Sequence, residues 1–310
     1  MRILILGAGG IGGYFGARLH EAGGDVSFLV RPARAEALRR DGLRLKSPLG
    51  DATLQPKVLT GDQVKDAFDL VILSCKAYDL DSAIDAIAPA VGRDTFVLPL
   101  LNGLAHLDRL DARFGAGGVL GGVAQISVTL APSGEIVHLQ PMARLVAGAR
   151  GGGKPADAVL EPLGALFARA KVDYDASKRI MQDMWDKLMF LATLASATCT
   201  MRAPLGVILE TVAGERFITG LLDEAERVAG GNGFPPVAQR VAAYRELLTQ
   251  RGSKIAASML RDIERGGPTE ADHIVGDLIA RGRRPDVAVP LLELAYSHLQ
   301  AYELQRTQRK

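Results

Sequence analysis

The first half of the chain alternates between short runs of consecutive apolar residues and longer segments with a helical pattern. The apolar runs predict strands at 2–6, 25–30, 69–75 and 95–102, and the segments after them predict helices at 11–22, 33–40, 79–88 and 103–111. Continuous apolar runs are typical of parallel strands that are buried on both faces. Because strand and helix alternate, the crossovers should be right-handed, which predicts a doubly wound α/β domain of the Rossmann type.

Two segments interrupt this alternation. Segments 43–58 and 118–139 each carry turn residues between two strand-like pieces, which predicts two hairpins, and a further short strand is predicted at 144–149. The glycine-rich segment 149–155 suits a linker, but a predicted helix at 156–170 and a strand-like piece at 171–175 still fit the first domain. We therefore predict a dinucleotide-binding domain over 1–176.

The remaining residues, 177–310, show helical periodicity and almost no strand signal, which predicts an all-α substrate and dimerisation domain. The apolar stretch 188–201 is too short to span a bilayer comfortably and predicts a buried core helix. Thr269 is predicted to cap a helix, with Asp272 as its capping-box partner. Pro285 and Pro290 are predicted to delimit a loop before the last helix.

The composition supports this picture. Hydrophobic residues make up 48% and charged residues 23% of the 310 positions, as in soluble two-domain proteins, and a net charge of +2 gives no reason to expect nucleic acid or membrane partners. The two cysteines, Cys75 and Cys199, lie far apart, which suits a reducing cytoplasm. No spacing of cysteine and histidine predicts a metal site, and the N-terminus does not resemble a signal peptide.

Gly7, Gly9 and Gly12 form a G-x-G-x-x-G motif directly after the first strand. The first glycine permits a tight turn, the second lets the backbone approach a pyrophosphate, and the third lets the helix pack closely on the strand. The free N–H groups of the helix N-terminus then attract the anion, so Gly10 and Ile11 are also expected to bind the cofactor. The alternative is a purely structural glycine-rich turn.

The end of the second strand indicates which dinucleotide binds. NAD sites usually have an acidic residue there for the ribose 2′-hydroxyl, but this strand ends in Val30 and Arg31, with Arg34 close by. Arginine suits a 2′-phosphate in charge and geometry, which favours NADPH. The alternative is that these arginines only solvate the start of a helix.

Reduction of a carbonyl places negative charge on its oxygen, which then needs a proton donor or a cation. Lys187 lies at the start of an apolar helix, where burial would lower its pKa and make it a better acid near neutral pH. It is equally compatible with a lysine that extends its ammonium to solvent. Glu270 lies in the predicted first turn of a helix, where an acid also favours the helix dipole.

Asn102 and Lys76 each follow a predicted parallel strand, and the carboxyl ends of such strands face the ligand crevice. Each is therefore a candidate for binding cofactor or substrate, although Asn102 with the next glycine also suits a simple turn. Spacing alone gives no case for Ser258.

These motifs together resemble the ketopantoate reductase family, whose members use NADPH to reduce a 2-oxo acid in pantothenate synthesis. The resemblance covers nearly the whole chain, through ILGAGGIGGYFGARL, LSCKAYDL, PLLNGL, MWDKL and SMLRDIERGGPTE. It implies a Rossmann-type domain followed by an all-α domain. The last block is the most specific, because its serine keeps the family's spacing to the catalytic glutamate.

The resemblance also implies roles for individual residues. Lys187 matches the general acid, Glu270 the glutamate that works with it, and Asn102 the asparagine at the nicotinamide end. Ser258 matches a serine that contacts the substrate carboxylate. In addition, two residues match cofactor-binding positions: Arg31 and Lys76.

One departure bears on the substrate. The family usually has asparagines four and eight residues after the lysine, on the same helical face, whereas this chain has Leu191 and Ala195. Each lost hydrogen bond costs about 1–3 kcal/mol for a substrate that needs it. A paralogue that reduces a less polar 2-oxo acid is therefore an alternative to the ketopantoate enzyme.

Two further alternatives differ in activity. A dehydrogenase of the β-hydroxyacid type also pairs a Rossmann domain with a helical domain and a lysine, but the leucine at 191 weakens that interpretation. A non-catalytic NADPH sensor would need neither Lys187 nor Glu270. We expect a cytoplasmic homodimer that acts on a small-molecule 2-oxo acid.

Overall fold

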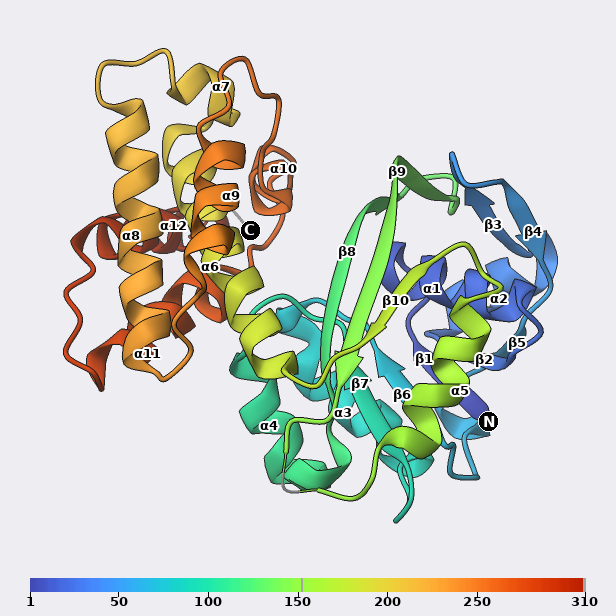
Figure 1. The fold of residues 1–310 in the computed structure, drawn as a ribbon. Helices are drawn as coiled ribbons and strands as arrows, with labels where there is room; N and C mark the ends of the chain where they lie inside the picture. The colour runs from blue at the N-terminus through green and yellow to red at the C-terminus, as the bar shows by residue number, and fades with distance from the viewer. Residues whose placement is uncertain (152, 309–310) are drawn as a thin grey trace. The chain divides into compact units, whose positions relative to one another are not determined.

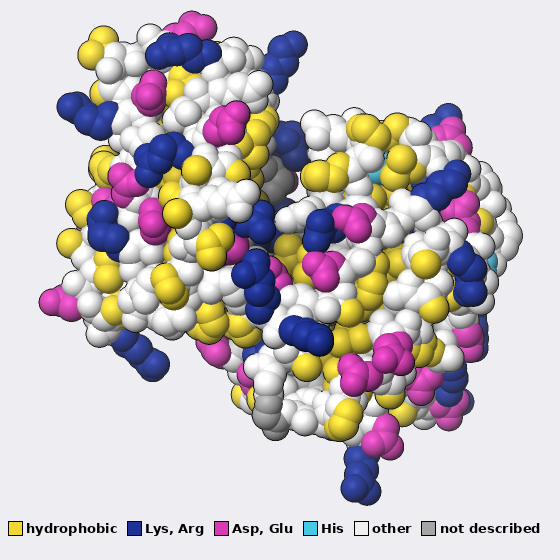
Figure 2. Space-filling model, in the orientation of Figure 1, with side chains coloured by type: hydrophobic (Ala, Val, Ile, Leu, Met, Phe, Trp, Pro, Cys, Tyr) yellow, Lys and Arg dark blue, Asp and Glu magenta, His cyan; other side chains and the backbone are white. Residues whose placement is uncertain are grey.

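The computed structural model describes residues 1–151 and 153–308 and divides the chain into two compact units (Figure 1). The first unit contains Met1–Leu101 and His106–Ile180, and the second contains Asn102–Ala105 and the chain from Met181 onward. Residue 152, inside the predicted linker at 149–155, lies outside the described residues. On the face drawn in Figure 2, basic and acidic side chains are intermixed.

A five-stranded parallel sheet forms the centre of the first unit, with the strand order β5-β2-β1-β6-β7. The strands are β1 (Arg2–Leu6), β2 (Asp25–Leu29), β5 (Lys57–Leu59), β6 (Leu70–Leu73) and β7 (Phe96–Pro99). All four residues of β6 and of β7 are buried, as the continuous apolar runs predicted. The strand order reverses at β1, so the Rossmann-type doubly wound prediction is confirmed.

Helices α1 (Gly10–Glu21), α2 (Pro32–Asp41) and α3 (Leu80–Ile87) follow β1, β2 and β6 in the chain. Helix α4 (Ala105–Phe114) follows β7, and α5 (Asp157–Phe167) packs against α1. Helix α1 also packs against strands of a second sheet, so it is buried on more than one side. This explains its glycines, since a Cβ on Gly16 would come within 2.6 Å of the Ile5 side chain and a Cβ on Gly13 would collide with Ile136.

The second sheet has the order β10-β9-β3-β4, and β8 also pairs with β9. Its strands are β3 (Leu43–Lys46), β4 (Ala52–Leu54), β8 (Gly121–Leu130), β9 (Ile136–Gly148) and β10 (Asp173–Ala176). Both predicted hairpins form, as antiparallel β3–β4 and β8–β9. The strand predicted at 144–149 forms, but not as a separate element, because residues 144–148 continue β9 and keep their pairing with β8.

The second unit is all-α, as predicted (Figure 1). Its helices are α6 (Ile180–Met201), α7 (Leu205–Ile208), α8 (Gly214–Gly231), α9 (Ala238–Leu248), α10 (Ser258–Glu264), α11 (Asp277–Arg283) and α12 (Pro290–Gln308), with a π-helical turn at Asp272–Gly276. Helix α8 packs against α9, α11 and α12. Among the described residues, no helix combines the length and the hydropathy that crossing a membrane requires.

The predicted capping box at Thr269 is wrong. The Thr269 hydroxyl is buried without a hydrogen-bond partner among the described residues, and the Thr269 N–H donates to Glu303 Oε1 of α12 at 2.6 Å. Asp272 instead accepts a 2.7 Å hydrogen bond from the Tyr296 hydroxyl. Contacts with α12 therefore replace the local cap. The last helix does begin at Pro290, where the loop was predicted to end.

Candidate active site

The glycine loop lies between β1 and α1, at the carboxyl edge of the parallel sheet. Gly7 adopts a φ of +89°, and its N–H donates to the Leu29 carbonyl at 2.9 Å. A Cβ on Gly12 would collide with Ser74 Oγ and lie 2.6 Å from the Gly7 carbonyl oxygen. These two glycines are thus required by the turn and by the packing of the helix on the strand.

Gly9 differs from its neighbours, because a Cβ there would meet no atom within 4 Å and its φ is −87°. The fold itself gives no reason for a glycine at this position, whereas close approach of a phosphate does. Gly9 is also the N-cap of α1, which has no side-chain cap and no acidic residue in its first turn. The N-terminus of α1 therefore fits the pyrophosphate of a dinucleotide.

Arg31 lies two residues after the buried end of β2, and its side chain is 80% exposed. Its Nη2 lies 3.1 Å from Asp79 Oδ1, in the turn Ala77–Asp79 that follows β6. Lys76 immediately precedes that turn and is half-buried. Because Leu6 pairs with Leu29 and with Leu73, these residues lie at the same sheet edge as the glycine loop.

Arg34, which the sequence suggested as a ligand of the 2′-phosphate, donates hydrogen bonds to backbone carbonyls instead. Its Nη2 donates to the carbonyls of Ala8 at 3.1 Å and of Gly134 at 3.0 Å. Burial, with a smaller effect of Arg44, lowers the pKa of its guanidinium. Arg34 therefore attaches the turn between β8 and β9 to the glycine loop. Sequence reasoning missed this role because the turn is 100 residues away.

In the helical unit, Lys187 lies in the second turn of α6 and is half-buried. Burial lowers the pKa of its ammonium from 10.5 to about 8, while the charge of Glu270 acts in the opposite direction. Glu270 itself is only 7% exposed. Lys187 is thus still a cation at neutral pH but gives up its proton far more readily than an exposed lysine, as a general acid requires.

The first turns of α6 are held firmly around this lysine. The neighbouring Asp186 is buried and accepts a 2.8 Å hydrogen bond from Gln182, with Arg240 Nε at 3.5 Å. The Trp185 ring stacks on Phe234, with the ring centroids 5.6 Å apart. These contacts fix the rotation of the helix and hence the direction in which Lys187 projects.

Asn102 follows β7 but belongs to the helical unit. The next residue, Gly103, has a φ of +86°, and a Cβ there would lie 2.7 Å from the His273 carbonyl oxygen. The structure therefore places Asn102, Lys187 and Glu270 in the same compact unit. The predicted cofactor-binding residues other than Asn102 lie in the first unit.

Ser258 is the first residue of α10 and is exposed. The N–H of Ala257, just before it, donates to Thr198 Oγ1 of α6 at 3.3 Å. Thr198 lies three helical turns after Lys187 and on the same face. Sequence reasoning missed Thr198, because a threonine in a helix gives no signal by itself.

The same face of α6 carries Leu191, which is half-buried, and Ala195, which is 3% exposed. The helix therefore offers no side-chain hydrogen-bonding group in the two turns after Lys187 on this face. Of the two side chains, only the half-buried Leu191 reaches the surface of the helix to an appreciable extent.

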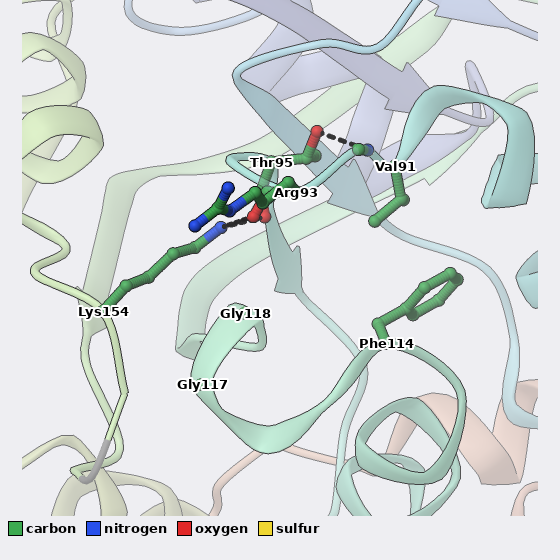
Figure 3. Close-up of a pocket in the computed structure, with 8 residues that line it drawn as sticks. Val91, Arg93, Thr95, Phe114, Gly117, Gly118 and Lys154 are labelled. Atoms are coloured by element: carbon green, nitrogen blue, oxygen red, sulfur yellow. Dashed lines mark hydrogen bonds between the residues drawn. The ribbon is translucent and has the colours of Figure 1, made fainter.

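A cavity of about 180 Å³ lies elsewhere, at the amino end of β7 (Figure 3). Its lining includes Arg93, Thr95, Phe114 and Lys154. The Lys154 ammonium donates to the carbonyls of Arg93 at 2.9 Å and Thr95 at 2.8 Å, so it supports the local loop. None of the predicted site residues lines this cavity, which opens at the opposite end of the strands from the glycine loop.

Comparison with known proteins gives matches over both units. The family model "Ketopantoate reductase PanE/ApbA" matches residues 3–152, and the model of that family's C-terminal part matches residues 179–303. An uncharacterized oxidoreductase of Bacillus subtilis, YkpB, is 37% identical, with 99% of this chain and 100% of that protein covered.

Solved structures are similar over the same length. The crystal structure of a PanE/ApbA family ketopantoate reductase from Ralstonia eutropha has a TM-score of 0.88 and 25% identity, covering 99% of this chain and 100% of that one. The 2-dehydropantoate 2-reductase of Geobacter metallireducens has a TM-score of 0.87 and 30% identity, covering 97% and 99%.

Proposed function

Because this chain belongs to the ketopantoate reductase family, we propose that it reduces 2-dehydropantoate to pantoate with NADPH, as a step of pantothenate biosynthesis. Family membership makes it an oxidoreductase that acts on CH–OH groups, of the ketopantoate reductase type. The observation that carries the proposal is the half-buried Lys187, whose pKa burial lowers to about 8 while the charge of the buried Glu270 acts in the opposite direction.

Bound NADPH supplies the hydride that converts the carbonyl carbon to CH–OH. In our proposal the Lys187 ammonium donates one proton from Nζ to the carbonyl oxygen as negative charge develops there. A positioned general acid of this kind accelerates a reaction by about 10²–10⁴-fold. Glu270 holds the ammonium by its charge and keeps it protonated near neutral pH. Asn102 binds at the nicotinamide end, and Ser258 contacts the substrate carboxylate.

The cofactor residues fit a dinucleotide. We propose that Gly7, Gly9, Gly10, Ile11 and Gly12 hold the pyrophosphate, because the fold leaves the space above Gly9 open. Arg31 and Lys76 would hold the 2′-phosphate and the neighbouring part of NADPH. The exposed ion pair between Arg31 and Asp79 is worth only about 0–1 kcal/mol, so a phosphate dianion can replace the carboxylate.

The choice of NADPH is tested with Arg31→Ala, since this side chain has no other described hydrogen-bond partner than Asp79. We expect KM for NADPH to rise by about tenfold or more, as loss of a charged hydrogen bond predicts, while KM for NADH is unchanged. Equal effects on both cofactors would contradict a 2′-phosphate contact.

A second substrate is favoured by a specific observation, the half-buried aliphatic side chain of Leu191 on the face of Lys187. It suits a 2-oxo acid with a less polar side chain than ketopantoate. Ketopantoate and its analogue without the terminal hydroxyl group form a matched pair. The two compounds differ only in this hydroxyl, which an asparagine side chain would bind.

NADPH oxidation is therefore measured with a panel of 2-oxo acids that includes this pair. Preference for ketopantoate supports pantoate synthesis, and preference for the deoxy analogue supports the less polar substrate. Lys187→Ala is the control, and its kcat should fall at least about tenfold while NADPH still binds. If the panel gives no turnover while NADPH binds tightly, the reductase proposal fails. A homodimer stays a prediction, which light scattering tests.

A further inference from the structure

The π-helical turn Asp272–Gly276 begins two residues after Glu270. Such widened turns are rare and occur frequently at functional sites, because they redirect side chains at a cost in helix stability. Here α12 supports the turn, since the Tyr296 hydroxyl donates to Asp272 Oδ1 at 2.7 Å. The same ring packs where Gly276 has no side chain, and a Cβ there would lie 2.9 Å from Tyr296 Cζ and Oη.

The inner side of this turn contacts the Asn102–Gly103 segment through His273. A Cβ on Gly103 would lie 2.7 Å from the His273 carbonyl oxygen and 3.1 Å from its ring Cδ2. Both the backbone and the imidazole of His273 therefore press against Gly103, which only a glycine with a φ of +86° permits. This contact is one reason that residues 102–105 belong to the helical unit, although they follow a strand of the first unit.

The charge of Glu270 also acts on His273. Burial lowers the pKa of its imidazole, whereas the charges of Glu270 and Asp277 raise it and Arg281 lowers it. Asp277 and Arg281 form an ion pair of 2.7 Å, so their effects on the ring partly cancel. Glu270 thus influences both Lys187 and His273, which places its carboxylate within electrostatic reach of the two.

We propose that His273 is a positioning residue of the active site: its ring and backbone carbonyl hold the Asn102–Gly103 turn against the π-helical turn that follows Glu270. Asn102, Lys187 and Glu270 then keep one mutual geometry, which His273 maintains from the π-helical turn. The inference rests on the proposed function for its catalytic meaning. The structural part, that this side chain holds the turn, stands independently of the substrate.

The test compares His273→Ala with His273→Phe, which keeps a ring, and with the matched control His298→Ala, which removes another half-buried histidine of the same unit, on α12. Amide hydrogen exchange of the peptide spanning residues 100–106 reports whether the turn is held. We expect exchange there to accelerate by about tenfold or more in His273→Ala, with α8 unaffected. The Phe variant should retain most of the protection, and the control all of it.

Activity is measured on the same proteins. Because small displacements of positioning groups reduce rates strongly, kcat of His273→Ala should fall by about tenfold while the Kd of NADPH changes less than about twofold. Unchanged exchange at 100–106 overturns the inference, as does equal acceleration at α8, which would indicate general destabilisation. An inactive wild type would refute the proposed function, but the exchange result would still decide whether His273 holds the Asn102–Gly103 turn.

Discussion

Lys187 predicts an alkaline limit on the reduction. A general acid must be protonated. Burial lowers the pKa of this ammonium to about 8, although the charge of Glu270 acts in the opposite direction. We therefore expect kcat/KM for the 2-oxo acid to be constant below this pKa and to fall about tenfold per pH unit above it. In the reverse direction the neutral amine is the base, so oxidation of the 2-hydroxy acid should rise with pH below this pKa and become constant above it.

The magnitude follows from the same pKa. A decrease from 10.5 to about 8 corresponds to about 3 kcal/mol by which the folded protein disfavours the charged lysine. The unfolded chain binds this proton more tightly, so this destabilisation is fully present below about pH 8 and disappears as the pH rises to about 10.5. Lys187→Met should then raise the free energy of unfolding at pH 7 by at most about 3 kcal/mol, less the cost of leaving Glu270 without its partner.

The assay follows NADPH absorbance from pH 6 to about 10 for the wild type and two variants, with substrate below KM so that kcat/KM is observed. Glu270→Gln removes the charge that raises the pKa of Lys187. The alkaline limb of the profile, where kcat/KM falls with pH, should therefore move to lower pH. Lys187→Arg keeps a cation that does not release its proton in this range, so the limb should disappear and kcat should fall.

Two results would refute this reasoning. A profile that stays flat through pH 8 and declines only near the ordinary pKa of lysine would show that the ammonium is not buried during reduction. Movement of the limb to higher pH in Glu270→Gln would show that Glu270 does not stabilise the protonated lysine.

Two further predictions use single substitutions. Gly12→Ala should lower the free energy of unfolding by about 1–3 kcal/mol in thermal melts, because its Cβ collides with Ser74 and the Gly7 carbonyl, whereas Gly9→Ala should melt like the wild type yet bind NADPH at least about tenfold more weakly in fluorescence titrations. Equal melting of both variants would contradict the separate roles. Leu191→Asn should raise the kcat/KM ratio of ketopantoate to its deoxy analogue by about tenfold, and an unchanged ratio would show that this position does not contact the substrate hydroxyl.

The first unit could be predicted from the sequence because its signals are local. The fully buried strands β6 and β7 are continuous apolar runs, and the glycine motif combines turn, approach and packing within six residues. The same reasoning failed for the capping box at Thr269. There a distant residue, Glu303, accepts the hydrogen bond from the Thr269 N–H that Asp272 would accept in a capping box, and α12 cannot be placed from the residues around Thr269.

The residues that support the site show the same limit. Arg34 bonds to Gly134, and Thr198 accepts a hydrogen bond from Ala257, across 100 and 59 residues respectively. Neither residue type signals such a role in a helix. The contact of Gly103 with His273 was likewise invisible, since an asparagine followed by glycine suits an isolated turn as well as one held by another element.

The structure also distinguishes positions 191 and 195, which the sequence alone predicts to affect the substrate in the same way. Leu191 and Ala195 both replace amides that the family usually carries, but Leu191 is half-buried and Ala195 is 3% exposed. A ligand next to Lys187 can therefore contact Leu191, one turn away, whereas Ala195 is enclosed by protein. An amide at 195 would need partners from within the core, and an unsatisfied one costs about 1–3 kcal/mol. The change at 195 is thus explained by packing of α6, and we expect the side chain at 191 to decide the substrate preference.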